Sequence, residues 1–520
     1  MTRTVVAPHG MVCSIDQLAS NAGVSILQMG GTAVDAAIAT SAVLAVTAQH
    51  SCGMGGDLFA LILTTGGPPA ALNSSGRAGS GADANKLRSQ GHDAIPHRGH
   101  ISAVPVPGCV DGWLSLHARF GQLDLRDVLG PAILYAENGF PAMASLAQAA
   151  KEIRHVAEHN DFAGISENQL VRRPGIARSL RAVVAEGRQG FYAGEFGEAL
   201  IELGQGEYSS DDLAADQAEW VSPLGIRVWD HDLWTIPPNS QGYLALAGTG
   251  IAAGLDLPDD TRDPLWAHYM VEAARAAAHD RVAELHEHAD GAALIDTERL
   301  DARRAKISSD GVADWKGTFN DGGTIYLTAV DHAGMGVSLI QSNCRGLGSY
   351  LVAGSTGIML HNRGIGFSLA DGHPAEYGAG MRPPHTLSPA LITRADSSLH
   401  SVLGTMGGDA QPQVVQQMAT RLLRHGQSAG EVIESGRFVL DSVGDGSSFE
   451  VWANEGDVNV KIEPWMEPAW RSGLEKRGHV VEVAPSGGGF GHAHCIERRA
   501  DGTLFGRADP RAEVSAASGY

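Results

Sequence analysis

Glycine is the residue that most constrains the fold of this chain. It makes up 66 of the 520 residues, nearly twice the usual share of about 7%. Many stand in short clusters, which are Gly53-Met54-Gly55-Gly56, Gly322-Gly323, Gly404-Thr405-Met406-Gly407-Gly408 and Gly487-Gly488-Gly489-Phe490-Gly491. Glycine has no Cβ, so it is favoured where the backbone needs a positive φ or approaches another group closely. The clusters therefore predict tight loops and close backbone contacts in a large sheet protein.

The hydrophobic pattern changes type along the chain. Before Thr324 the apolar residues recur mostly at helical spacing, and after it the runs are strand-forming. Helices are expected over 14–29, 36–46, from 110, around 132–136 and over 178–186, 195–203 and 265–287, and strands over 58–63, 324–330, 337–342, 493–497 and 503–505. Thr32 with Asp35 and Ser209 with Asp212 predict capping boxes. Helices first and strands later predict an α+β fold rather than a doubly wound sheet.

The charge and cysteine content exclude several classes of protein. The chain has 38 Lys and Arg against 59 Asp and Glu, a net charge of −21, which argues against binding to nucleic acid or to an anionic membrane. Its five scattered cysteines form neither a disulfide framework nor a zinc pair. With no apolar leader at the start and no membrane-spanning apolar run, the expected location is the cytoplasm.

Three local patterns resemble ligand sites but have simpler interpretations. Gly248-Thr249-Gly250-Ile251-Ala252-Ala253 fits a loose dinucleotide fingerprint, yet it follows a helical pattern where a strand is needed. His286-Glu287-His288 lacks the spacing that places two imidazoles on one helix face. His492 and His494 share one face of an expected strand, from which Cys495 points away. No metal and no organic cofactor is therefore predicted.

The feature with most chemical content is Asp321-Gly322-Gly323-Thr324, in which two unhindered glycines precede a threonine that opens a strand. Alone, this pattern is a loop entering a sheet. It gains weight because further motifs occur in order along the chain. These are Ala19-Ser20-Asn21-Ala22-Gly23, Gly30-Gly31-Thr32-Ala33-Val34-Asp35-Ala36-Ala37, Gly53-Met54-Gly55-Gly56-Asp57, Pro107-Gly108 with Gly112-Trp113, Glu272-Ala273 with Asp280-Arg281, Tyr326 with Asp331, Gly354-Ser355-Thr356-Gly357-Ile358, Arg382-Pro383, Gly407-Gly408-Asp409, Asp509-Pro510-Arg511 and Gly519-Tyr520.

In these motifs the chain resembles the γ-glutamyltransferase family of N-terminal-nucleophile hydrolases. The resemblance implies a four-layer αββα sandwich and self-cleavage between Gly323 and Thr324. Residues 1–323 would form a large subunit and residues 324–520 a small one, intertwined as one domain. The Thr324 hydroxyl would be the nucleophile. Its new α-amine, which titrates at about 7.7–8.0, would be the base.

The resemblance also assigns roles to other residues. Gly407 and Gly408 match paired glycines whose N–H groups face the developing oxyanion. Ser342 stands where the family has a second hydroxyl that supports the nucleophile. Arg77 matches the arginine that binds the substrate carboxylate, with a surface ion pair as the alternative interpretation.

The substrate pocket departs from the γ-glutamyl pattern. Gly366 stands in place of an acid that binds the glutamyl α-ammonium, and Cys344 replaces an asparagine. His385-Thr386 replaces a pair of serines. Without the acid a buried ammonium would be uncompensated, and Arg363 adds a second cation near Asn362.

Together with Arg77, the residues expected to bind substrate are Asn362, Arg363, His385 and Thr386. The pocket suits a carboxylate-bearing acyl group without an α-amine, which resembles the amidohydrolase and acylase members of the family, similar to oxamate amidohydrolase or glutaryl acylase.

We therefore expect a self-processing amidohydrolase that cleaves a small carboxylate-bearing amide through an acyl-Thr324 ester. One alternative is a true γ-glutamyl hydrolase or transpeptidase, and a more remote one is a non-catalytic binding protein on the same fold. The expected partners are the small-molecule substrate, the two cleaved subunits with each other, and a dimer of the cleaved pair, with no nucleic acid and no membrane.

Overall fold

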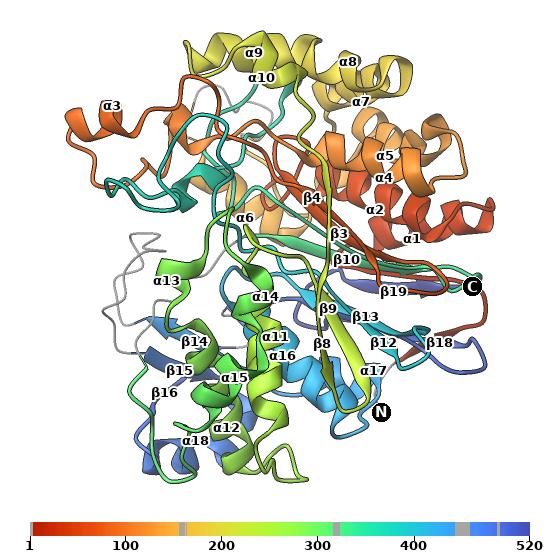
Figure 1. The fold of residues 1–520 in the computed structure, drawn as a ribbon. Coiled ribbons are helices and arrows are strands. Elements are labelled where there is room, and N and C mark those ends of the chain that lie inside the picture. The colour runs from red at the N-terminus through yellow and green to blue at the C-terminus, as the bar shows by residue number, and fades with distance from the viewer. Residues whose placement is uncertain are drawn as a thin grey trace.

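Two seven-stranded antiparallel sheets lie face to face in the computed structural model of the chain (Figure 1), which describes residues 4–154, 156, 162, 164–315, 323–442, 458–485 and 489–520. The first sheet has the spatial order β1 (Val5–Ala7), β18 (Leu504–Ala508), β17 (Ala493–Arg498), β13 (Leu399–Thr405), β12 (Ala390–Arg394), β9 (His231–Thr235) and β8 (Leu224–Val228). The second has the order β19 (Ala516–Gly519), β2 (Met11–Ser14), β10 (Ile325–Val330), β11 (Gly336–Ser342), β3 (Asp57–Leu63), β4 (Ala70–Ser74) and β7 (Glu219–Val221).

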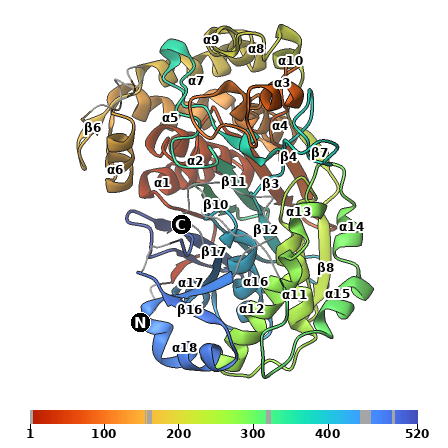
Figure 2. The same ribbon diagram turned by 90° about the vertical axis from the view of Figure 1, so that its left-hand side faces the viewer.

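Helices cover the outer face of each sheet (Figure 2). The second sheet is covered by α1 (Gln17–Gln28), α2 (Ala33–Thr47) and α4 (Cys109–Phe120), with α5 (Leu125–Asn138) packed on α2. The first sheet is covered by α11 (Tyr243–Ala253), α16 (Ala410–Leu423) and α17 (Ala429–Glu434), with α12 (Pro264–Ala278) packed on α11. The prediction of an α+β fold is confirmed.

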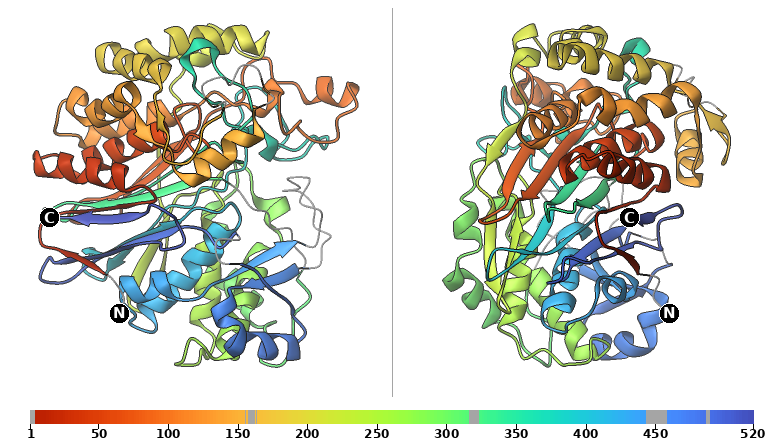
Figure 3. Two further views of the ribbon diagram at one scale, coloured as in Figure 1. Left: turned by 180° about the vertical axis from the view of Figure 1, so that it is seen from behind. Right: turned by 90° about the vertical axis from the view of Figure 1, so that its right-hand side faces the viewer.

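The remaining elements lie around this stack, as the two further views in Figure 3 show. The helices are α3 (Ala84–Ser89), α6 (Ala144–Glu152), α7 (Pro174–Glu186), α8 (Arg188–Tyr192), α9 (Glu195–Gly204), α10 (Ser210–Ala214), α13 (Arg281–Glu284), α14 (Gly291–Leu294), α15 (Thr297–Arg304) and α18 (Glu467–Lys476). The strands are β5 (Phe140–Pro141) with β6 (Leu170–Val171), and a three-stranded sheet of β14 (Phe438–Ser442), β15 (Val458–Ile462) and β16 (Val480–Val483). No helix in the described ranges is both long and apolar enough to cross a bilayer.

Segments from before and after Gly323 alternate within both sheets. The hairpin of β10 and β11 lies between β2 and β3, and the four strands β18, β17, β13 and β12 lie between β1 and β9. Between the sheets, β10 packs on β13 and β17. The core therefore draws on both halves of the chain.

The motif that starts α2 has a structural explanation. Thr32 accepts a hydrogen bond from the Asp35 N–H, and the Asp35 carboxylate accepts from the Thr32 N–H, so the predicted capping box is present. Asp331 at the end of β10 accepts a further bond from Ala33 N, 2.9 Å away. All fifteen residues of α2 are buried, and their apolar character on all sides is what a central helix requires.

Most of the expected elements are confirmed, but three expectations are wrong. The first third has strands other than the single expected one, because β2 and β4 were not predicted, and Ser14 belongs to β2 rather than to a helix. The middle region also holds β7, β8 and β9. The long helix expected over 265–287 ends at Ala278, where the following charged residues leave helical spacing to form tertiary ion pairs, Asp280 with Arg303 and Arg281 with Asp409.

The dinucleotide-like stretch lies inside α11, not between a strand and a helix. Its glycines therefore pack the helix against its neighbours: a Cβ on Gly248 would lie 2.4 Å from Gln416 Oε1.

The closing Asp509-Pro510-Arg511 motif forms a buried ion network. The Asp509 carboxylate accepts from Arg437 Nη1 at 2.7 Å, Ala493 N at 2.6 Å and Arg511 N at 2.9 Å. Burial alone would raise the pKa of Asp509, but the charges of Arg437 and Arg511 outweigh it and hold the pKa below its ordinary value. A carboxylate with a lowered pKa stabilises the fold above its unfolded pKa and loses that effect as the pH falls.

We predict that Asp509→Asn lowers the free energy of unfolding by about 3–5 kcal/mol near pH 7, because it leaves Arg437 buried without its partner. The difference from wild type should shrink below about pH 4, where Asp509 becomes protonated on unfolding. Denaturant unfolding at both pH values measures it, in a Thr324→Ala background that we expect to stay uncut and so to refold. Asp260→Asn, which removes an exposed pair with Arg262, is the control and should change little; a pH-independent difference would contradict the account.

Candidate active site

The register of strands β10, β11 and β3 determines which residues lie next to Thr324, the predicted nucleophile. Ile325 pairs with Gln341 and Ser342 pairs with Asp57 across β10, β11 and β3. Thr324, the residue before β10, therefore lies opposite Ser342 at the end of β11. The β10–β11 hairpin and β3, which is distant in the chain, therefore meet at this end of the second sheet.

Two hydroxyl groups converge on the Gly323 carbonyl. Thr324 Oγ1 and Ser342 Oγ each donate to Gly323 O at 2.7 Å, and the two hydroxyl oxygens are 3.1 Å apart. Ser342 Oγ accepts from Cys344 N at 2.8 Å. Both side chains are buried, at 1% exposure. The Thr324 hydroxyl thus adjoins the peptide bond that precedes it, and Ser342 can polarise that carbonyl.

Gly407 and Gly408 form a turn that links β13 to α16. Both have positive φ, +122° and +57°, a conformation that favours glycine. Within the described part of the chain, neither backbone N–H donates a hydrogen bond to another group. Because they precede the N-terminus of a helix of fourteen residues, these free donors suit a developing negative charge.

A buried carboxylate, Asp57, organises the loops next to Ser342. It accepts from His385 Nε2 at 2.9 Å and Gly76 N at 2.9 Å, and His361 Nδ1 lies 3.3 Å away. Burial alone would raise the pKa of Asp57, but the interaction with His361 and the hydrogen bond from His385 hold it well below its ordinary value. The residue was not predicted as part of the site, although a charged residue opening a buried strand is an available signal.

His385 is fixed by its surroundings rather than free to move. Its Nε2 donates to Asp57, and its Nδ1 accepts from Leu387 N at 3.3 Å, which defines the neutral tautomer. Burial, together with the nearby charge of Arg363, lowers the pKa of His385 to about 3. The ring therefore supports the loop that carries Thr386.

Arg363 is a buried cation with no acidic partner in the part of the chain that the structure describes. It is 1% exposed, and its Nη1 donates to Thr386 Oγ1 at 3.2 Å, whereas its Nε and Nη2 have no hydrogen-bond partner among the described residues. No carboxylate of the described residues forms an ion pair with it. Its charge lies close enough to lower the pKa of the Cys344 thiol, which burial raises. Such an uncompensated charge is costly unless a ligand neutralises it.

Arg77 differs from Arg363 in both exposure and pairing. Its side chain is 32% exposed, and Nη1 contacts Glu287 Oε1 at 2.5 Å and Gly380 O at 2.9 Å. Nη2 lies 3.5 Å from Glu219 Oε2. Arg77 follows Gly76, so its backbone adjoins Asp57 while its side chain reaches a cluster of acids.

Asn362 ties together the two loops beside the nucleophile. Its Oδ1 accepts from Arg345 N at 3.1 Å, its Nδ2 donates to His97 O at 3.1 Å, and its backbone N–H donates to Asn343 O at 3.3 Å. Contacts therefore link Thr324 to Ser342, and Asn362 to the segment that follows Ser342, whereas the Arg77 side chain lies against Glu287 and Glu219.

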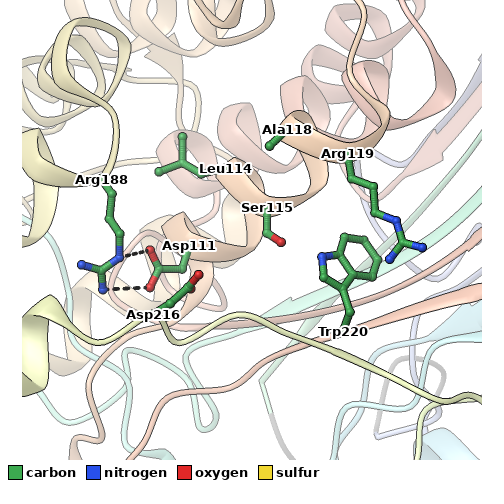
Figure 4. Close-up of a pocket in the computed structure, with 8 residues that line it drawn as sticks. All are labelled: Asp111, Leu114, Ser115, Ala118, Arg119, Arg188, Asp216 and Trp220. Atoms are coloured by element: carbon green, nitrogen blue, oxygen red, sulfur yellow. Dashed lines mark hydrogen bonds and ion pairs between the residues drawn. The ribbon is translucent and has the colours of Figure 1, made fainter.

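An open hollow of about 520 Å³ lies elsewhere, among α4, α8 and β7 (Figure 4). There Arg188 forms a two-point ion pair with Asp111, with Nε 2.9 Å from Oδ1 and Nη2 3.1 Å from Oδ2. Arg119 Cζ lies 4.2 Å from the centre of the Trp220 ring. Burial raises the pKa of Asp111 to about 6. The hollow contains none of the predicted site residues, so we do not place the reaction there.

His492, His494 and Cys495 do not form a metal site in the structure. His494 Nδ1 accepts from Asp509 N at 3.3 Å, and Cys495 is buried on β17. Among the described residues, no group of three or more His, Cys, Asp or Glu side chains is arranged to hold a metal ion.

Comparison with known proteins gives a consistent match over the whole chain. A family model described as Gamma-glutamyltranspeptidase matches residues 19–519. The chain is 35% identical to an oxamate amidohydrolase proenzyme of Klebsiella pneumoniae and 33% identical to a glutathione hydrolase-like proenzyme, YwrD, of Bacillus subtilis, covering 99% of each chain. The crystal structure of a cephalosporin acylase from Bacillus halodurans superposes with a TM-score of 0.91 at 30% identity, over 100% of this chain and 97% of that one.

Close packing behind Ser342 yields a prediction. A Cβ on Gly56 would lie 2.3 Å from Ser342 O and 2.6 Å from Asn343 Oδ1, so Gly56→Ala must displace the end of β11. We expect a loss of stability of about 1–3 kcal/mol, measured by thermal unfolding. Gly130→Ala in α5, where nothing lies within 4 Å of the new Cβ, is the matched control and should stabilise slightly. Equal thermal unfolding midpoints for Gly56→Ala and Gly130→Ala would contradict the close approach of Gly56 to Ser342 O.

Proposed function

The chain belongs to the gamma-glutamyltranspeptidase family, and on that premise we propose that it is a self-processing amidohydrolase of the N-terminal-nucleophile type. Its fold would be the four-layer αββα sandwich of that superfamily, and its substrate a small amide whose acyl group carries a free carboxylate. The relatives named as an oxamate amidohydrolase and a cephalosporin acylase support this class of reaction.

The observation that carries the proposal is the convergence of Thr324 and Ser342 on the Gly323 carbonyl. In the proposed maturation, Thr324 Oγ1 adds to the Gly323 carbonyl carbon, the Gly323–Thr324 C–N bond breaks, and the nitrogen takes a proton. Water then hydrolyses the ester, leaving a carboxylate on Gly323 and a free amine on Thr324. Ser342, 2.7 Å from the carbonyl oxygen, would stabilise the charge that develops there. The designation of two relatives as proenzymes agrees with this step.

The mature enzyme would use one residue as nucleophile and base. The Thr324 amine accepts the hydroxyl proton as Oγ1 attacks the substrate carbonyl, and then protonates the departing amine. The Gly407 and Gly408 N–H groups would bind the oxyanion, and loss of such a donor typically costs about 10²–10³ in rate. Water finally hydrolyses the acyl-Thr324 ester to the free acid.

For the carboxylate of the acyl group we propose Arg363 as the principal partner. An arginine fork binds a carboxylate through two parallel hydrogen bonds, and within the described ranges the Nε and Nη2 atoms of Arg363 have no hydrogen-bond partner. Arg77 has the family position, but its guanidinium pairs with Glu287. Thr386 and Asn362 would hold the loops that shape this subsite.

The same subsite lacks a partner for an α-ammonium. Gly366 supplies no carboxylate, and the neighbouring charge is that of Arg363. A Cβ on Gly366 would lie 2.7 Å from Pro384 O, so an aspartate introduced there would disturb the loop. The alternative activity, γ-glutamyl hydrolysis or transfer, is better tested by comparing substrates on the wild-type enzyme.

Maturation is the first test. We predict that Thr324→Ala gives one chain of 520 residues in a denaturing mass spectrum, because the attacking hydroxyl is absent, whereas wild type gives pieces 1–323 and 324–520. Thr328→Ala, in the same strand, is the matched control and should still be cleaved. A fragment beginning at residue 324 in Thr324→Ala would overturn the mechanism.

Arg363 provides the second test, with opposite effects on stability and activity. Arg363→Met removes an uncompensated buried charge, so the thermal midpoint of the ligand-free protein should rise. Its kcat/KM for monoamides of short dicarboxylic acids should fall about 10²-fold, the equivalent of about 2.7 kcal/mol.

Arg77→Met is the comparison and should lower stability, because it leaves Glu287 without its close partner.

Wild type should prefer acyl groups without an α-amine over their γ-glutamyl counterparts by at least about tenfold in kcat/KM. A preference for γ-glutamyl amides would show that the enzyme has the γ-glutamyl activity instead. Unchanged kinetics in Arg363→Met would indicate that Arg77, not Arg363, binds the carboxylate.

A further inference from the structure

The turn that would bind the oxyanion has little rigidity of its own. Gly407 and Gly408 have no side chains, and glycine has the largest conformational freedom of any residue. An oxyanion site is effective only when its donors are already oriented before the reaction. Contacts from other segments must therefore fix this turn.

Gln241 supplies such a contact from the loop between β9 and α11. Its side chain is fully buried, and its Nε2 donates to Gly408 O at 3.0 Å and to Thr386 O at 3.1 Å. One amide group therefore holds both the oxyanion turn and the loop that carries Thr386. Thr386 Oγ1 in turn accepts from Arg363 Nη1. These contacts therefore connect the turn that would bind the oxyanion with the arginine that would bind the acyl carboxylate.

Arg281 determines which way the Gln241 amide faces. Arg281 Nη1 donates to Gln241 Oε1 at 3.1 Å and lies 2.7 Å from Asp409 Oδ1. An arginine can only donate, so the Gln241 oxygen must face it and the NH₂ group must face the two carbonyls. Arg281 thus holds Gln241 and also the residue that follows Gly408.

We propose that Gln241 is a positioning residue, oriented by Arg281, that fixes the oxyanion turn relative to the acyl-carboxylate subsite. The inference rests on the proposed function, since it assigns a task within that reaction. Gln241 does not touch the reacting atoms: its task is to hold the Gly408 peptide, and so the neighbouring N–H donors, in the reactive orientation.

The test is Gln241→Met, which keeps the length of the side chain and removes both donated bonds. Gln416→Met is the matched control: Gln416 is a buried glutamine of α16 whose Nε2 donates to Met270 O at 3.1 Å, outside the site. Both variants should lose stability to a similar degree. Only Gln241→Met should lower kcat for the cleaved enzyme, by at least about tenfold, with a smaller change in KM.

A kcat for Gln241→Met within twofold of that for Gln416→Met would overturn the proposal. Gln241→Glu decides the question if Gln241→Met does not fold or is not cleaved: a carboxylate keeps the shape of the side chain and can still accept from Arg281 Nη1, but it cannot donate to Gly408 O and Thr386 O. The kcat should therefore fall here too, and an unchanged value contradicts the inference. An uncleaved or inactive wild type would instead refute the proposed function itself, so the two failures are distinguishable.

Discussion

The hydrogen-bond register of β10, β11 and β3 is the constraint on which the site depends. It places Thr324 opposite Ser342 and Ser342 opposite Asp57. A shift of one residue would turn each side chain to the other face of the sheet, and the two hydroxyl groups would no longer meet at the Gly323 carbonyl. The buried Gly56 contact behind Ser342 and the all-buried helix α2 on β10 and β11 leave the strands little room to slip.

Buried charges in this chain fall into two kinds. Asp509 with Arg437, Asp409 with Arg281 and Asp57 with its histidines are compensated within the fold. Arg363 is not compensated by any carboxylate in the described residues. Removing one member of a buried ion pair by mutation lowers the stability of the fold, because its partner is left unpaired. A buried charge that has no partner already lowers the stability of the wild-type fold. This contrast separates residues that build the site from one suited to a ligand.

Local sequence signals predicted much of the fold because they depend on neighbours in the chain. The capping box at Thr32, the strand after Thr324 and the hairpin to Ser342 are of this type. The break after Ala278 could not be predicted, since it follows from ion pairs with residues distant in sequence, such as Asp409. For the same reason the contacts by which Asp57 and Gln241 orient other groups emerge only from the structure, whereas Arg363 was identified from its place in the segment that departs from the γ-glutamyl pattern.

The placement of the β10–β11 hairpin in the middle of a sheet has a consequence for biogenesis. Its neighbours β2 and β3 both precede Gly323, so a large piece made alone would have two unpaired strand edges facing a gap, which is an aggregation hazard. Chain continuity keeps the missing strands at high local concentration while the sheet forms. If the chain is cut at Gly323–Thr324 as proposed, that tether is lost, and unfolding would become a step from which the two pieces do not readily refold. The lifetime of the mature protein would then depend on its rate of unfolding rather than on an equilibrium.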